Sequence, residues 1–457
     1  MKPMKNSRTW IRYSLLLLLL GGAMSTSRKC VAQQRALARK IQADTTLKAV
    51  QAMAADLLKT GFNAGSGYSE VWIRDFNTFI ALSCMVVPSD MVKAKLRVFF
   101  QMQGDDGNII DGYVPREKAH GGYDYIYRNN APQFAGHKNT VETDQETSLI
   151  QAVYKYIRAT GDTAFLSERI AGKPVRDRMR GALQYLMDKR FSRQYGLIYG
   201  ATTVDWGDVQ PETPWGVEMD SSSHPAIDIY DNAMLVIALN DYLDLFPDDK
   251  HWASVRAAIC KHIMQYLWDD SQHKFIPHIY LAGSPFPADF NENAIHYHGG
   301  TAMAILAGLL RKKQIKTVND RMLADVKAAG AQSIGLTIYP PYPAGFFLNK
   351  SMGPYSYQNG GDWTWFGARM ITALVRSGFV AEAYRELQPM VQRVLVQGGF
   401  HEWYTREGKP AGSGLFRGGA GVLYTAISAL QQWAERQATD HHAHGSSARD
   451  QGAVIGR

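Results

Sequence analysis

The pattern of hydrophobic positions predicts a chain built almost entirely of α-helices. From about residue 35 onward, apolar side chains recur three or four residues apart, which places them on one face of a helix. One such face comprises Leu149, Ile150, Val153, Tyr154 and Ile157, with Gly161 following as a helix cap. Similar patterns occur near residues 48–60, 74–86, 89–103, 174–190, 226–245, 251–268, 298–311, 364–377, 379–396 and 419–436. Few segments alternate with period two, so no large sheet is expected.

Long linkers rich in Gly, Pro, Asp, Trp and Tyr separate these helices. They cover residues 104–142, 192–225, 275–297, 338–363 and 397–418. Loops of this length in a compact domain are usually functional or disordered, and the aromatic content of these loops argues against disorder. The eleven predicted helices come close to the twelve that six helical hairpins contain. We therefore predict an all-α fold, an (α/α)6 toroid or six-hairpin barrel over residues 33–440, whose long loops build one cleft.

The N-terminus has the pattern of an export signal. The basic stretch 2–12 precedes the apolar run 15–20 and a few small residues. The run is too short to span a bilayer as a stable anchor. We predict that residues 1–32 are a signal peptide, cleaved after Ala23 or Ala32, and that the mature chain is periplasmic or secreted. Attachment of lipid at Cys30 is the alternative, but the residues before it are not small and apolar.

Charge and composition narrow the possible partners. Six basic and no acidic residues precede residue 31, so the net charge of +8 falls to +2 (8 − 6) without them. The body of the chain therefore has no basic stripe for nucleic acid. Its Cys and His residues show no metal-binding spacing, and no phosphate-binding loop is present, so we expect no metal or cofactor. We also expect a monomer without stable membrane insertion, and a disordered polar tail at residues 441–457.

Two loop motifs place acids beside Trp. The first contains Trp72, Arg74 and Asp75. The guanidinium of Arg74 donates hydrogen bonds and the carboxylate of Asp75 accepts them, which suits the vicinal hydroxyls of a pyranose. A structural ion pair at a helix start is the alternative. In the second, Asp205 and Asp208 flank Trp206 and Gly207. Burial against an indole and repulsion between carboxylates would raise the pKa of a general acid, although the motif also fits a surface turn.

A third motif places Glu402 between His401 and the aromatic pair Trp403 and Tyr404. A carboxylate among aromatic side chains on a loop is costly unless it binds something, and it could activate water as a base. Two remote carboxylates facing one cleft are what inverting glycoside hydrolysis requires. The ten Trp and 23 Tyr residues could line such a cleft, or they could fill the core.

Further candidates lie at predicted helix starts. Gly-Gly pairs precede Asp362 and Trp363 and follow His298, which gives free backbone N–H groups at the positive end of a helix. The alternative is a flexible helix entry. Asp144 opens another helix, whose Thr143-x-x-Glu146 pattern matches a capping box.

In order along residues 66–432, these motifs resemble those of the six-hairpin glycosidases, which include glucoamylase, trehalase, processing α-glucosidases and neutral/alkaline invertases. The segments 72–76 and 358–363 resemble the invertase motifs Val-Arg-Asp-Phe and Gln-Asn-Gly-Gly-x-Trp. The segment 400–404 is similar to the Glu-x-Tyr of processing glucosidases, which implies that Glu402 is the general base. The sequence Asp-Trp-Gly-Asp at 205–208 resembles the Asp-Trp-Asn-Asp of cellobiose-type phosphorylases, which favours Asp208 over Asp205 as the acid, although Gly replaces Asn.

The resemblance implies an inverting exo-glycosidase for α-linked glucosyl or related neutral oligosaccharides, with Asp208 and Glu402 as catalytic residues. The expected substrate-binding residues are Trp72, Arg74, Asp75, Asp144, Asp205, Trp206, His298, Asp362, Trp363, Trp403 and Tyr404. One alternative is a phosphorylase, but the β-sandwich of those enzymes is missing before residue 48. Others are an epimerase or lyase with His298, His401 or Tyr404 as the base, and a non-catalytic sugar-binding protein.

Overall fold

The computed structural model describes residues 31–119 and 124–447, with side chains up to residue 439. The predicted signal sequence up to residue 30, Cys30 and residues 448–457 lie outside the described residues. The chain divides into two compact units. One contains residues 46–427. In the other, residues 31–43 and the later turns of the last helix are helical.

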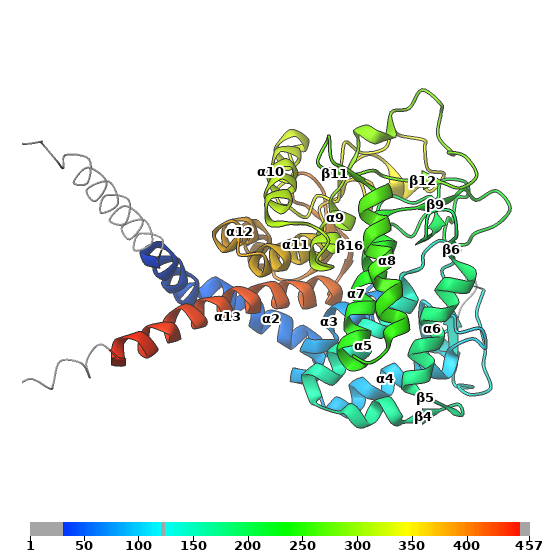
Figure 1. Cartoon of the computed structure of the whole chain (residues 1–457), viewed down its shortest axis with the longest axis horizontal. Coiled ribbons are helices and arrows are strands. Elements are labelled where there is room, and N and C mark those ends of the chain that lie inside the picture. Colours follow the sequence, from blue (N-terminus) through cyan, green and yellow to red (C-terminus); the bar gives the residue numbers. More distant parts are fainter. Residues whose placement is uncertain (1–30, 120–123, 448–457) are drawn as a thin grey trace, which may run out of the picture. The chain divides into compact units, whose positions relative to one another are not determined.

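Helices make up most of the described chain, which confirms the all-α prediction (Figure 1). The named α-helices are α2 (Thr45–Leu58), α3 (Ile73–Val86), α4 (Ser89–Met102), α5 (Asp144–Thr160), α6 (Val175–Lys189), α7 (Ile229–Leu245), α8 (Lys250–Tyr266), α9 (His298–Leu306), α10 (Lys312–Ala329), α11 (Thr364–Arg376), α12 (Val380–Gln397) and α13 (Arg417–Ser447). The last turns of α13 therefore extend into the range 441–457 that was expected to be a tail.

Alternate helices form an inner ring. Helix α3 packs on α5, α5 on α7, α7 on α9 and α9 on α11, while α4, α6, α8 and α12 each pack on the inner helix that precedes or follows them in a hairpin. The inner helices α7, α9 and α11 are buried on nearly every side, as an inner layer requires. Helix α13 reaches α3 through Gly421, where an added Cβ would lie 2.5 Å from the Cα of Phe79. This succession is the six-hairpin toroid that the sequence predicts.

The strands are short and belong to the loops. They are β1 (Val71–Trp72), β2 (Gly112–Pro115), β3 (Phe134–His137), β4 (Arg169–Ile170), β5 (Lys173–Pro174), β6 (Phe191–Ser192), β7 (Leu197–Ile198), β8 (Gly200–Ala201), β9 (Pro225–Ile227), β10 (Trp268–Asp269), β11 (Lys274–Phe275), β12 (Ile279–Tyr280), β13 (His296–Tyr297), β14 (Ile338–Tyr339), β15 (His401–Tyr404) and β16 (Pro410–Gly414). Antiparallel sheets in the orders β1-β2-β3 and β12-β9-β8 have three strands each, and the others are pairs. The long loops therefore have ordered structure of their own.

The region of α9 and α10 differs from the prediction. The hydrophobic pattern indicated one helix over residues 298–311, whereas α9 ends at Leu306 and Gly308 takes a left-handed φ of +81° that ends the turn. The next helix, α10, was not predicted. Its buried face includes Asn319 and Asp325 among apolar residues, and these polar positions interrupt the hydrophobic repeat.

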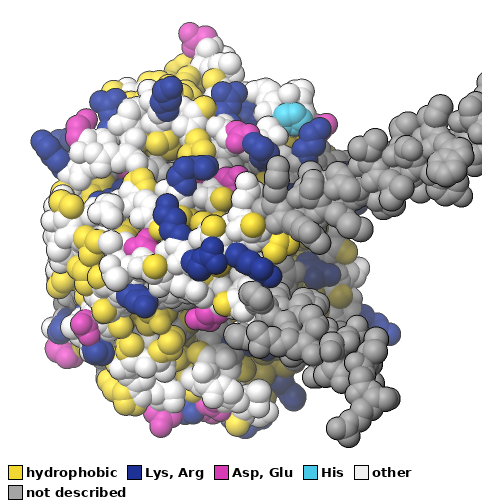
Figure 2. Space-filling model, turned by 90° about the vertical axis from the view of Figure 1, so that its left-hand side faces the viewer, with side chains coloured by type: hydrophobic (Ala, Val, Ile, Leu, Met, Phe, Trp, Pro, Cys, Tyr) yellow, Lys and Arg dark blue, Asp and Glu magenta, His cyan; other side chains and the backbone are white. Residues whose placement is uncertain are grey.

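Three further observations concern the charged side chains, the apolar helices and the cysteines of the described chain. On the face shown in Figure 2, Lys and Arg side chains are dispersed among hydrophobic and uncharged ones. No helix among the described residues is long and apolar enough to cross a bilayer. Cys84 and Cys260 are both free thiols.

Candidate active site

One cleft of about 470 Å³ gathers most of the predicted residues. Its lining comprises Tyr68, Trp72, Arg74, Asp75, Asp111, His137, Asn139, Trp206, Asp208, Val209, Trp215, Val217, Asn349, Ser351, Tyr357, Gln358, Trp363, Trp365, Glu402, Trp403, Gly412 and Phe416. The residues come from the first turns of α3 and α11, from the residue before α13, and from the long loops. Helix N-termini carry partial positive charge, which favours carboxylates at this end of the ring.

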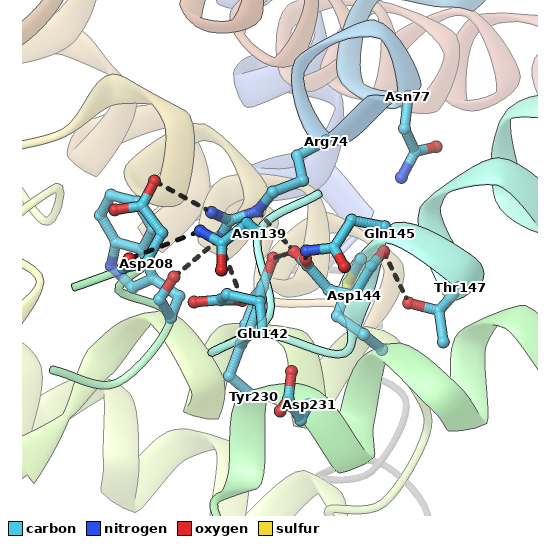
Figure 3. A network of polar contacts seen from close by, with 12 residues as sticks. Arg74, Asn77, Asn139, Glu142, Asp144, Gln145, Thr147, Asp208, Tyr230 and Asp231 are labelled. Carbon is cyan, nitrogen blue, oxygen red and sulfur yellow. Dashed lines mark hydrogen bonds and ion pairs between the residues drawn. The ribbon is translucent and has the colours of Figure 1, made fainter. Parts of the chain in front are cut away.

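Arg74 is the central cation of the cleft, and its side chain is almost fully buried. Figure 3 shows the polar contacts around it. Its Nε donates to Asp144 Oδ2 at 2.7 Å, and its Nη2 donates to the carbonyl oxygen of Trp206 at 2.7 Å. Its Nη1 lies 3.5 Å from Asp208 Oδ2, and its Nη2 lies 3.4 Å from Glu142 Oε2. The guanidinium therefore links the loop of Asp208 to the start of α5.

Acids around Arg74 keep this cation charged. Glu142 and Asp144 lie beside it, and Tyr230 on α7 donates its hydroxyl to Asp144 Oδ2 at 2.8 Å. Burial raises the pKa of Glu142 well above its ordinary value, although the charge of Arg74 lowers it. A buried cation that is paired with acids is held in one position, because breaking a pair leaves an uncompensated buried charge.

Asp208 has an oriented but accessible carboxylate. Gln358 donates from Nε2 to Asp208 Oδ1 at 2.6 Å, and the amide oxygen of Gln358 accepts from the Asp208 backbone N–H at 3.2 Å. The Asp208 side chain is 28% exposed, whereas that of Arg74 is 7% exposed. A ligand in the cleft can therefore reach the Asp208 carboxylate while Gln358 and Arg74 hold its orientation.

Glu402 lies on β15 and is almost fully buried. Tyr68 donates its hydroxyl to Glu402 Oε1 at 2.8 Å, and the backbone N–H of Ser413 donates to Oε2 at 2.7 Å. Burial raises the pKa of Glu402, the two hydrogen bonds lower it, and the charge of Asp208 raises it further. A carboxylate with a raised pKa is a stronger base than an exposed one.

Two further carboxylates, Asp75 and Asp111, line the cleft. Burial raises the pKa of Asp75 to about 7 and that of Asp111 to about 8, and in both cases Arg74 opposes the shift. Near neutral pH these groups can donate as well as accept hydrogen bonds, which suits the hydroxyls of a sugar.

Aromatic rings form one wall of the site. The Trp206 ring centroid lies 4.7 Å from that of Trp363 and 5.2 Å from that of Trp365, both edge to face. Trp403 and Tyr357 form a second aromatic pair, with centroids 6.5 Å apart. Flat apolar rings beside carboxylates are suited to a pyranose, which has apolar C–H faces and polar edges.

The cleft brings together eight predicted residues and leaves out five. Those that line it are Trp72, Arg74, Asp75, Trp206, Asp208, Trp363, Glu402 and Trp403, whereas Asp144, Asp205, His298, Asp362 and Tyr404 do not. Asp144 supports the site from behind through Arg74. Its neighbour Glu146 accepts from the Ile109 backbone and from Lys138, and Thr143 makes no side-chain cap bond, so the expected capping box is not formed.

Asp205 faces the start of α9 instead of the cleft. Its two carboxylate oxygens accept from the backbone N–H of Gly300 at 3.0 and 2.9 Å. Burial raises the pKa of Asp205 to about 8. The Gly-Gly segment at this helix start therefore binds an acid of the chain itself, and the Gly300 N–H is not available to a ligand.

The remaining three residues stabilise the ring. His298 contacts the Leu336 carbonyl oxygen and Asp325. Asp362 pairs with Arg393 at 2.8 Å, and the Arg393 guanidinium lies 4.0 Å from the ring centroid of Tyr404. These contacts join α12 to the loops before α11 and after α12.

Several lining residues were not predicted. Tyr68, Asp111, Trp215, Asn349 and Ser351 lie outside the motifs identified in the sequence, although some of them share a linker with such a motif. Apart from Tyr68, their one shared signal was a position in the long linkers. Gln358 was part of a recognised motif, but its bond to Asp208 spans 150 residues of the chain and could not be read from local sequence.

The chemistry available in the cleft is that of acids and bases. Asp208 and Glu402 are the two carboxylates held by defined partners, and Arg74 already contacts three acids. His137 also lines the cleft, and burial lowers its pKa to about 4, so it is neutral near pH 7. Among the described residues, no group of three or more His, Cys, Asp or Glu has the arrangement of a metal site.

Comparisons with known proteins identify the family of the chain and support its fold. The family model for the glycosyl hydrolase 94 superfamily, catalytic domain, matches residues 39–396, a range that contains Arg74 and Asp208 and ends before Glu402. No match was found among curated protein sequences.

The structure is similar to solved glycosidases. A GH63 mannosylglycerate hydrolase from Thermus thermophilus, in complex with Tris and D-glycerate, has a TM-score of 0.60 and 17% identity, over 82% of this chain and 99% of the other. A rhamnosidase from Klebsiella oxytoca with rhamnose bound has a TM-score of 0.55 and 14% identity, over 84% of this chain and 64% of the other. At such identities the likeness concerns the fold.

Proposed function

Because the chain belongs to the glycosyl hydrolase 94 superfamily through its catalytic domain, we propose that it is an exported, inverting exo-glycosidase for α-linked glucosyl or related neutral oligosaccharides. In this proposal Asp208 protonates the departing glycosidic oxygen and Glu402 deprotonates the attacking water. Arg74, Asp75, Trp363 and the aromatic wall hold the terminal sugar.

The observation that carries the proposal is that Asp208 and Glu402 line the same cleft in different surroundings. Glu402 is buried and hydrogen-bonded by Tyr68 and Ser413, and its raised pKa makes it a stronger base than an ordinary exposed carboxylate. Asp208 is the more accessible of the two, so it can reach the bridging oxygen of a bound sugar. One acid and one base are the complete set of groups that inverting hydrolysis requires.

Hydrolysis fits the charges of the cleft better than phosphorolysis. A phosphate nucleophile needs cations, and the lining contains Arg74 and the neutral His137 as its basic residues. Arg74 is already shared among Asp144, Glu142 and Asp208. Glu402 would repel an incoming phosphate, whereas it can activate a neutral water molecule.

An epimerase or lyase has less support. Those reactions need a base beside the sugar ring, and the candidates were His298, His401 and Tyr404. None of the three lines the cleft, and His298 and Tyr404 are occupied by contacts with Asp325 and Arg393.

A product assay tests the proposal. The purified mature chain is incubated with α- and β-linked glucosyl and mannosyl disaccharides and with mannosylglycerate, each with and without phosphate. We expect free sugar without phosphate, and a loss of about 10²–10⁴-fold in both Asp208→Asn and Glu402→Gln. The control is Asp289→Asn, which changes an exposed acid and should leave the rate unaltered. A rate that depends on phosphate, or high activity in either variant, contradicts the proposal.

The two roles can be separated with a glycosyl fluoride, because fluoride departs without a protonating acid. Asp208→Asn should hydrolyse the fluoride at nearly the rate of the unaltered enzyme, whereas Glu402→Gln should not. The opposite pattern would exchange the two roles. Export is tested separately, by the N-terminal sequence and cellular fraction of the mature chain.

A further inference from the structure

The rim of the cleft carries a half-exposed tryptophan on an ordered loop. Trp215 lines the cleft and is 49% exposed, whereas the other lining tryptophans in contact with one another, Trp206, Trp363 and Trp365, are buried. An exposed indole at the mouth of a site keeps a large apolar face in water until something covers it. This loop, residues 209–217, directly follows Asp208.

The loop is held by its own backbone contacts. The N–H of Gly216 donates to Thr213 Oγ1 at 2.9 Å, and the N–H of Gln210 donates to the Gly216 carbonyl oxygen at 2.8 Å. The Val217 carbonyl oxygen accepts from the N–H of Thr140 at 3.1 Å. Gly216 has a φ of +80°, and a Cβ there would lie 2.7 Å from Val209 Cγ1, so glycine permits this turn. Trp215 is therefore presented from a defined position.

A second loop completes the rim. Leu348 donates its N–H to the Pro211 carbonyl oxygen at 3.0 Å, and Asn349 Nδ2 donates to the Trp215 carbonyl oxygen at 3.4 Å. Asn349 also accepts from the backbone and hydroxyl of Ser351. Both Asn349 and Ser351 line the cleft, so the two loops meet beside the same opening.

The position of this rim relative to Asp208 indicates what it contacts. A general acid must lie beside the oxygen that leaves, so the residues adjoining Asp208 face the leaving group. Arg74 is almost fully buried, whereas Trp215 is 49% exposed, so the rim that follows Asp208 is the part of the lining open to solvent.

The rim is also uncharged. The residues that line the cleft from these two loops are Val209, Trp215, Val217, Asn349 and Ser351, and none is Lys or Arg. An anionic leaving group such as glycerate would find no cation on them, whereas a neutral ring can stack on an indole and use the nearby amide and hydroxyl groups.

Resting on the proposed function, we infer that Trp215, with Asn349 and Ser351, forms the subsite for the leaving group, and that this group is a neutral sugar. Trp215 stacks against its ring, and the two polar side chains bind its hydroxyls. The subsite therefore contributes to the binding of disaccharides and oligosaccharides. It does not contribute to the binding of substrates that consist of the terminal sugar alone.

The test compares a disaccharide with a substrate that has no second sugar. We measure kcat/KM of the full mature chain on maltose and on α-D-glucosyl fluoride, or on the disaccharide cleaved best and the fluoride of its terminal sugar in the same anomeric form. In Trp215→Ala, kcat/KM on the disaccharide should fall by about tenfold or more, the effect of losing one well-packed contact. The rate on the fluoride should stay within about twofold of the unaltered enzyme. Trp215→Phe should recover most of the disaccharide activity.

The outcomes separate the two proposals. An equal loss on both substrates, or unchanged disaccharide activity in Trp215→Ala, overturns the subsite while the hydrolase stands. A preference of the unaltered enzyme for mannosylglycerate over neutral mannosyl disaccharides contradicts the inference that the leaving group is a neutral sugar. If the unaltered enzyme hydrolyses neither the disaccharide nor the fluoride, the proposed function falls, and the subsite falls with it.

Discussion

Tyr68 and Ser413 hold the Glu402 carboxylate with one hydrogen bond to each oxygen. Both donors favour the charged form, so they lower the pKa that burial has raised. The balance between these opposing effects determines the pKa of Glu402, the proposed base. At the residue scale, the proposed catalysis therefore depends on a tyrosine that contributes a single O–H group.

Removing that O–H group should shift the pH dependence of the enzyme. In Tyr68→Phe, Glu402 loses a donor to its charged form, so its pKa rises. A base must be deprotonated, and the acidic limb of the kcat/KM profile should therefore move to higher pH. The measurement is a pH–rate profile on the substrate identified by the product assay. The matched control is Tyr199→Phe, whose hydroxyl bonds the Lys189 carbonyl oxygen outside the cleft; an unmoved limb in Tyr68→Phe would contradict the role.

The local sequence predicted which acids lie near the site better than it predicted the residues that each acid contacts. Asp205 and Asp208 lie in one motif, yet one accepts from Gly300 on α9 and the other from Gln358. The left-handed φ of +54° at Asp205 turns the chain between them. Residue spacing does not predict such turns or the distant residues that stabilise them. For the same reason, the sequence did not identify Tyr68 and Asp111 as residues of the site.

At the element scale, the hairpin of β15 and β16 shapes the space around Glu402. Gly412, with a φ of +65°, faces this carboxylate, and a Cβ there would lie 2.4 Å from Glu402 Oε2. The glycine therefore serves both the turn and the close approach of the acid.

Gly412→Ala should lower kcat strongly, whereas its loss of unfolding free energy should be no larger than that of a control variant. The added methyl group displaces Glu402, so we expect kcat to fall by about tenfold or more, as small misplacements of reacting groups do. Gly398→Ala is the control, because Gly398 has a φ of +70° and no atom within 4 Å of the added Cβ. Both variants should lose about 1 kcal/mol of unfolding free energy from the strained backbone. Steady-state kinetics and urea unfolding of the pair measure this, and equal activities would contradict the contact.

The start of α9 should respond to pH through Asp205. Its pKa of about 8 lies above the value in an unfolded chain, so the folded state keeps a proton that the unfolded state releases. The stability from this group is therefore present at low pH and is lost as the pH rises through about 8. Relative to the unaltered protein, Asp205→Asn should gain stability between pH 5 and about 8. Thermal melts across this range test the sign, with Asp289→Asn as the control that should show no such trend.

Most of the elements themselves could be predicted. Helices with strongly apolar faces, such as α5 and α11, followed directly from their periodicity. Helix α10 did not, because buried Asn319 and Asp325 are satisfied by Glu386 and by histidines from other segments. In the sequence, a polar residue that is buried against a distant partner cannot be distinguished from an exposed polar residue.

At the scale of the whole molecule, the ring depends on the contact between its first and last inner helices. Gly421 on α13 approaches the backbone of α3, and a Cβ there would lie 2.7 Å from the Thr78 carbonyl oxygen. Main-chain atoms on a packed helix cannot move aside as a side chain can.

Gly421→Ala should therefore weaken the fold despite the better helix propensity of Ala. Overpacking of this kind costs about 1–3 kcal/mol. The matched control is Gly181→Ala on α6, where the nearest atom lies 3.8 Å from the added Cβ, so Ala should be neutral or stabilising. Denaturant unfolding of both variants measures the difference, and a stable Gly421→Ala protein would show that the helices can separate without cost.

The bond between Tyr68 and Glu402 joins residues 334 positions apart, and the bond between Thr78 and Gly418 spans 340. Hairpins such as α3–α4 and α11–α12 need only neighbouring sequence and can form one after another as the chain is synthesised. The entropy of closing a very long loop makes contacts between the two ends of the barrel slow to form. The proposed active site is thus completed late: nearly the whole chain must leave the ribosome before β15 can meet the loop before α3, so a shorter nascent chain lacks part of the site.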